Sequence, residues 1–179
     1  SATVASRISW FSRTEAVRTA LTLTQELETT FERIRVERMA DVPILNSMVR
    51  VEAVGFEPHH PDFIGVLVTP WFMNLMLVPE DPDAAAGELP GETRLCSFPA
   101  GDFEFIAGFE HGLGHYCMCS LFSPMFDFAD HDAAVATAEA VMAGIMTPDE
   151  ATAEDAAGVS ERPMSRRELF RQLAGSSSA

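Results

Sequence analysis

The sequence predicts an α+β protein: an antiparallel β-sheet of five to six strands, with an N-terminal helix and one or two C-terminal helices packed on one face. Three observations predict this class. A helical apolar period opens the chain, several short strand-like apolar runs follow, and a second helical period comes after them. No helical pattern separates the strand-like runs, which disfavours a parallel sheet of βαβ units.

The first helix is predicted by an apolar stripe spaced four, four and three residues apart. The stripe consists of Leu23, Leu27, Phe31 and Ile34. Two capping-type sequences compete for its start, Ser12-Arg-Thr-Glu15 and Thr22-Leu-Thr-Gln25. The helix is expected to end near Ala40, before the proline at position 43.

Short apolar runs between turn signals predict the strands. They cover residues 48–56, 63–69, 74–78, 102–109 and 113–122. In the fourth run, Phe103, Phe105, Ala107 and Phe109 fall on every second position and share one face, which is typical of a half-buried strand. Residues 80–92 are rich in Pro, Ala, Gly and acids and predict a loop.

A second helix is predicted after Asp130, which supplies the cap, and is expected to stop at Pro148. The chain is accordingly divided into four parts. These are an N-terminal extension (1–20) that can be helical, a single α+β domain (21–147), a mobile acidic linker (148–164), and a short basic helix with a flexible tail (165–179).

Composition excludes several classes of function. The chain is 47% hydrophobic and 22% charged, as in globular proteins, and no apolar run approaches the roughly 20 residues of a membrane span. Its N-terminus does not resemble a signal peptide. The number of cysteines, three, is odd, which argues against a disulfide framework, so a cytoplasmic setting is expected. The net charge of −15 disfavours nucleic acid and stable membrane association and favours a basic partner.

Signature motifs of common enzymes, such as a P-loop or an H-E-x-x-H zinc motif, are missing, so neither an enzyme nor a cofactor is expected. The most reactive stretch is His115-Tyr-Cys117-Met-Cys119, which places three soft ligands on one face of a strand. A metal site there is one interpretation. Packing of the thiols in the core is the other, because cysteine is often buried and no C-x-x-C knuckle is present.

Two segments rich in aromatic and methionine residues are each interrupted by a proline, one around Pro70 and one around Pro124. Such residues are enriched in the cores of protein interfaces. We therefore predict that the segments lie side by side at one edge of the sheet and bind a partner, the alternative being that they fill the core. The predicted partner-binding residues are Trp71, Phe72, Met73, Phe122, Met125 and Phe126.

The segment Ser165-Arg-Arg-Glu-Leu-Phe-Arg171 looks like a twin-arginine export motif. It lies at the wrong end of the chain, and no apolar region follows it, so it is not an export signal. We predict instead a short basic helix that docks Leu169, Phe170 and Leu173 on the body of the protein.

Three of these stretches resemble the NiFe-hydrogenase assembly chaperones of the HybE/HupJ type. They are Gly65-Val-Leu-Val-Thr-Pro-Trp-Phe-Met-Asn-Leu75, Cys119-Ser-Leu-Phe-Ser-Pro-Met125 followed by Phe128-Ala-Asp130, and Ser165-Arg-Arg-Glu-Leu-Phe170. Their order and spacing also agree, and the likeness extends from about Leu23 to Leu173.

The resemblance implies a cytoplasmic maturation chaperone without catalytic residues. Its partner would be an immature NiFe-hydrogenase subunit, whose assembly or twin-arginine export it delays until cofactors are inserted. A metal or cofactor carrier that uses Cys117, Cys119 and nearby histidines is the alternative function. A homodimer is compatible with either function, and the rubredoxin domain fused to some relatives is missing here.

Overall fold

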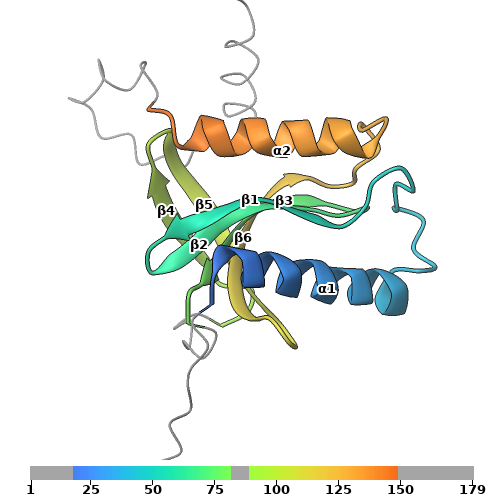
Figure 1. Cartoon of the computed structure of the whole chain (residues 1–179), viewed down its shortest axis with the longest axis horizontal. Coiled ribbons are helices and arrows are strands. Elements are labelled where there is room, and N and C mark those ends of the chain that lie inside the picture. The colour runs from blue at the N-terminus through green and yellow to red at the C-terminus, as the bar shows by residue number, and fades with distance from the viewer. Residues whose placement is uncertain (1–17, 82–88, 149–179) are drawn as a thin grey trace, which may run out of the picture.

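The computed structural model describes residues 18–81 and 89–148, which form a six-stranded antiparallel sheet with one helix on each side (Figure 1). The strands are β1 (Glu52–His59), β2 (Asp62–Val68), β3 (Met73–Pro79), β4 (Thr93–Phe98), β5 (Gly101–Glu110) and β6 (Gly114–Phe122), and the helices are α1 (Ala20–Arg38) and α2 (His131–Ile145). Their order across the sheet is β1-β2-β3-β6-β5-β4. The predicted α+β class with an antiparallel sheet is confirmed.

The two helices cover opposite faces of the sheet, which differs from the predicted packing on one face (Figure 1). One core gathers around α2 and the other around α1. The physical reason lies in the central strands β2 and β3, whose residues from Phe63 to Val68 and from Met73 to Val78 are all buried. A strand that is apolar on both faces needs a covering element on both sides.

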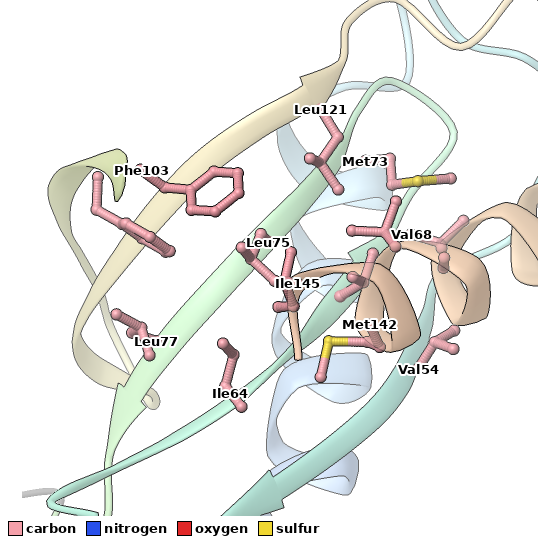
Figure 2. Close-up of a cluster of buried hydrophobic side chains, with 14 of the residues drawn as sticks. Val54, Ile64, Val68, Met73, Leu75, Leu77, Phe103, Leu121, Met142 and Ile145 are labelled. Atoms are coloured by element: carbon pink, nitrogen blue, oxygen red, sulfur yellow. The ribbon is translucent and has the colours of Figure 1, made fainter. Parts of the chain in front are cut away.

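The core on the α2 side is made of alternate residues from the strands and the apolar stripe of the helix. Figure 2 shows Met142 and Ile145 of α2 packed toward Leu75 of β3 and Val54 of β1. The predicted cap of this helix is confirmed, since the Asp130 carboxylate accepts a hydrogen bond from the backbone N–H of Ala133.

The core on the α1 side contains the four-residue stripe that predicts this helix. The helix begins between the two candidate starts, because the Thr19 hydroxyl accepts a hydrogen bond (3.1 Å) from the Thr22 backbone N–H. The side chain of Thr22 reciprocates at the N–H of Thr19, which completes a capping box. The alternative start at Ser12 lies outside the described residues.

The sheet curls, so that its two edge strands approach each other. In a flat sheet, strands β1 and β4 would be separated by about 24 Å, five spacings of nearly 5 Å. Instead, the ring of His59 in β1 stacks on Phe98 in β4 at 5.2 Å, and Arg94 of β4 reaches Asp62 of β2 at 3.4 Å. The concave side encloses the α2-side core, which leaves the convex side of β4 and β5 facing outward.

Most predicted strands are found, with two differences. β1 begins at Glu52 rather than at residue 48, and the edge strand β4 was not predicted. The linker 148–164, except for Pro148, the basic segment 165–179 and most of the extension 1–20 lie outside the described residues. In the two described ranges, neither helix is both long enough and apolar enough to cross a membrane.

Candidate functional site

The two proline-interrupted segments meet at one end of the central strands. Met73 opens β3, Phe122 closes β6, and these two residues are Cα partners across the antiparallel pair. The segments therefore lie side by side. Because β3 and β6 are the two middle strands of the sheet, the segments lie at its strand ends and not along an edge strand.

The six predicted partner-binding residues differ widely in exposure. Met73 and Met125 are fully buried in the α2-side core, and Trp71 is only 8% exposed in the core below α1. These three side chains hold the fold together and do not reach the surface. Phe72 and Phe122 are half-buried, and Phe126 is 59% exposed.

A tight turn determines where Trp71 and Phe72 point. The Thr69 backbone N–H donates to the Phe72 carbonyl at 2.8 Å, and the Thr69 hydroxyl accepts from the Phe72 N–H at 2.9 Å. In this turn the Phe72 ring packs edge-on against Phe31 of α1 at 5.8 Å. The turn thus anchors one aromatic residue under the helix while one side of Phe72 stays accessible.

Asn46 joins the segment between α1 and β1 to both proline-interrupted segments. Its backbone N–H donates to the Pro70 carbonyl at 2.8 Å, and its side-chain amide donates to the carbonyls of Met125 and Phe128 at 2.9 and 2.8 Å. Its side-chain oxygen accepts from the N–H of Met48 at 3.0 Å. The backbone and side chain of this one residue therefore fix three loops relative to one another.

The loops carry exposed apolar residues that the sequence analysis missed. Met48 is 58% exposed and Ile44 is 37% exposed, both within two residues of Asn46. The sequence pattern predicts a strand at Met48, whereas β1 begins only at Glu52 and Met48 lies in the preceding loop. We call the following set the apolar rim. It consists of Ile44, Met48, Phe72, Phe122 and Phe126.

A groove of about 740 Å³ opens beside the apolar rim, between α1 and residues 45–51. Asn46 and Pro70 line it, so it shares its wall with the loops that carry the rim. Glu28 and Glu32 of α1 supply carboxylates on the opposite wall.

The charged residues of the groove are partly engaged. The Glu28 carboxylate accepts from the N–H of Ala53 at 3.2 Å. Arg35 forms an ion pair with Glu32 at 2.6 Å, and its hydrogen bond lowers the pKa of that exposed carboxyl. Arg50 also lines the groove. The mixed charge and the apolar mouth are suited to an extended peptide with both polar and apolar side chains.

His131, the first residue of α2, anchors the wall of the groove that is formed by residues 45–51. Its Nδ1 accepts from the backbone N–H of Arg50 at 3.2 Å, so the ring proton is on Nε2, which donates to Glu52 at 2.7 Å. The ring is 6% exposed. This pair of bonds ties residues 50–52 to the helix below them.

The proposed ligands of a metal site do not come together. Cys117 and Cys119 pack in or against the α2-side core, while the His115 ring lies 5.0 Å from Phe109 near the opposite end of β6 from the rim. No group of three His, Cys, Asp or Glu side chains suited to a metal ion occurs within residues 18–81 and 89–148. None of the three cysteines forms a disulfide.

Comparison with known proteins identifies relatives over most of the chain. Residues 22–172 match the family described as "[NiFe]-hydrogenase assembly, chaperone, HybE". The chain is 44% identical over 144 residues to the hydrogenase expression/formation protein HupJ of Bradyrhizobium diazoefficiens, covering 79% of this chain and 82% of that protein. It is also 44% identical over 129 residues to protein HoxT of Cupriavidus necator, covering 66% and 72%.

The solution structure of HybE from Escherichia coli has the same fold, with a TM-score of 0.57 at 21% sequence identity, covering 69% of this chain and 76% of that one. An antiparallel sheet between two helices, with loops that expose an apolar rim, defines an α+β protein with a surface suited to docking another polypeptide. The chain belongs to the HybE family of NiFe-hydrogenase assembly chaperones.

Proposed function

We propose that this chaperone binds an immature NiFe-hydrogenase subunit in the cytoplasm and delays its assembly or twin-arginine export until the cofactors are inserted. One observation carries the proposal: the region matched by the chaperone family contains an exposed apolar rim beside a groove. The rim would hold apolar residues of the client, and the groove would accept the adjoining extended segment.

The residues of the rim suit a client that is not yet folded. Methionine has a flexible, polarizable side chain that adapts to irregular surfaces, and an exposed phenylalanine offers a large apolar contact. The net charge of −15 would attract a basic client segment, such as one with twin arginines, from a distance. Glu28 and Glu32 would receive such a segment in the groove.

The central experiment is affinity capture of the chain from cells that express the hydrogenase operon. The mass of the captured subunit reports its maturation state, and light scattering reports whether the complex is 1:1 or 2:2. We expect a precursor that still lacks its final processing. Capture of mature, folded enzyme alone would contradict the proposal.

A pair of variants tests the surface. Met48→Ser and Phe126→Ser should each weaken precursor capture by about tenfold or more, as expected when an apolar anchor is removed from an interface centre. Phe109→Ser is the matched control, because Phe109 is 46% exposed but lies near the opposite end of the sheet strands. Equal losses in the control, or full capture by both rim variants, would assign the client to another surface.

A further inference from the structure

The basic segment near the C-terminus has no role in the function proposed above. Residues 165–173 contain Arg166, Arg167 and Arg171 but one acid, Glu168, whereas the chain as a whole has a net charge of −15. Three apolar residues accompany the arginines, namely Leu169, Phe170 and Leu173. The family match extends to residue 172, so nearly all of this segment lies within the matched range.

The convex face of β4 and β5 offers an uncovered surface of complementary chemistry. Leu95 is 53% exposed and Ile106 is 39% exposed, and each sits in register with a residue of the neighbouring strand on the same face. No residue of β4 or β5 belongs to the core that α1 covers, as judged over residues 18–81 and 89–148. The helix therefore leaves this half of the sheet open.

The same face carries an acidic residue that lacks a cation. Glu104 is exposed and lies directly opposite Leu95 in the β4–β5 pair. Within the described ranges, no ion pair involves Glu104, whereas Glu110 of the same strand pairs with Arg38. An apolar patch beside a carboxylate that has no ion pair within the described ranges suits a segment that contains both arginine and apolar side chains.

The chain leaves α2 beside the turn that joins β4 to β5, so the convex face is reached around the end of these two strands. The carbonyl of Ile145, the last residue of α2, accepts a hydrogen bond (3.2 Å) from the N–H of Ala100, which lies in the turn between β4 and β5. Sixteen residues separate Pro148 from Ser165. An extended linker of that length spans up to about 50 Å, and Leu95 lies only about 10 Å along β4 from the turn.

We propose that residues 165–173 of the chain dock on the convex face of β4 and β5, with their apolar side chains over Leu95 and Ile106 and an arginine beside Glu104. The tether favours this occupant, because a linked segment has an effective concentration in the millimolar range. A second copy is disfavoured, since pairing this face with itself would bring two Glu104 carboxylates together.

Charge reversal in the full chain tests the proposal. Backbone amide NMR shifts of Leu95, Glu104 and Ile106 are compared between the wild-type chain and the Arg166→Glu/Arg167→Glu/Arg171→Glu variant. We expect these amides to shift, while those of Leu21 and Val36, which are exposed on α1, stay in place. Arg162→Glu, outside the segment, is the control and should leave the three amides unchanged.

A charge swap distinguishes contact from a general charge effect. Glu104→Arg alone should reproduce the shifts of the triple variant at Leu95 and Ile106, and combining it with the triple reversal should restore the wild-type positions. A chain ending at Pro148 should match the triple variant.

Three results would overturn the proposal. The first is no change at β4 and β5 in either the triple variant or the shortened chain. The second is a change that maps to the apolar rim instead. The third is a change that grows with protein concentration, which would assign the segment to a second copy. None of these readouts depends on capture of a hydrogenase subunit.

Discussion

Asn46 is the residue on which the geometry of the apolar rim depends most. Its side-chain amide donates to the carbonyls of Met125 and Phe128, and its oxygen accepts from Met48. Asn46→Ala removes the amide donor from the two part-buried carbonyls, of which that of Met125 keeps only the Phe128 N–H, so we expect the free energy of unfolding to fall by about 1–3 kcal/mol. Urea denaturation measures the loss. Ser47→Ala, at the exposed neighbour, should change it by less than about 0.5 kcal/mol.

Asp62 gives the protein a predictable response to pH. Burial raises the pKa of its carboxyl, and the nearby Arg94 guanidinium offsets this only in part. A carboxyl whose pKa rises on folding contributes stability that is full below its unfolded pKa and is lost as the pH rises through its folded pKa. Asp62→Asn should therefore stabilise the fold at pH 7, by no more than about 1 kcal/mol, and add nothing at pH 3.

Urea midpoints at the two pH values check this expectation, with the exposed Asp41→Asn as the matched control. A variant at Asp62 that is less stable than wild type at pH 7 would mean that the attraction of Arg94 outweighs the cost of burial.

At the level of single residues, the sequence indicates which segments are rich in apolar residues but not which of their side chains are exposed to solvent. The segment around Pro70 was correctly singled out as apolar, yet Met73 is fully buried. Phe126 is exposed although it directly follows the buried Met125. Which of two neighbouring apolar residues faces solvent depends on Asn46 and the loops it joins, and these contacts connect residues about 80 positions apart.

At the level of elements, local patterns were sufficient for most of the fold. The stripe of α1, the cap of α2 and the alternation in β5 are signals that can be read locally, and the corresponding elements are present. β4 was missed because its residues Thr93–Phe98 mix polar and apolar types on both faces. Placement of both helices on one face failed because buried runs in β2 and β3 indicate covering on both sides.

The pairing of β1 with β2 depends on a glycine that makes room for a ring. A Cβ atom at Gly65 of β2 would overlap the ring of Phe56 in β1. Gly65→Ala should therefore destabilise the protein by about 1–3 kcal/mol through overpacking. In a double-mutant cycle with Phe56→Ala, we expect the two losses to be less than additive, because removing the ring relieves the overlap. Fully additive losses would show that the ring is not the cause.

At the level of the whole molecule, the sheet separates two buried cores, each of which is covered by one helix. Exposed apolar side chains lie at the strand ends and on the convex side of β4 and β5. The antiparallel architecture followed from the order of elements along the chain. Strand alternation puts Leu95 and Phe98 on opposite faces of β4, but the curl of the sheet, which brings β1 against β4 and makes the face of Leu95 convex, has no local signature.

Arg18 is bonded to the fold although it precedes the domain boundary that the sequence predicts at residue 21. Its guanidinium is buried and donates to the carbonyls of Pro79 and Leu113, both at 2.9 Å, and to the Glu26 carboxylate at 2.6 Å. A fragment of residues 21–148 loses these bonds and also the Thr19 cap of α1.

We therefore expect the 18–148 fragment to unfold cooperatively and to be more stable than the 21–148 fragment by about 2–4 kcal/mol, the combined worth of a helix cap and buried hydrogen bonds to a charged group. Urea denaturation of the two fragments gives the difference, and Arg18→Ala in the longer fragment separates the two contributions. Equal midpoints would mean that residues 18–20 lie outside the cooperative unit. A large loss from Arg18→Ala alone would show that one buried cation joins α1 to the far ends of β3 and the β5–β6 turn.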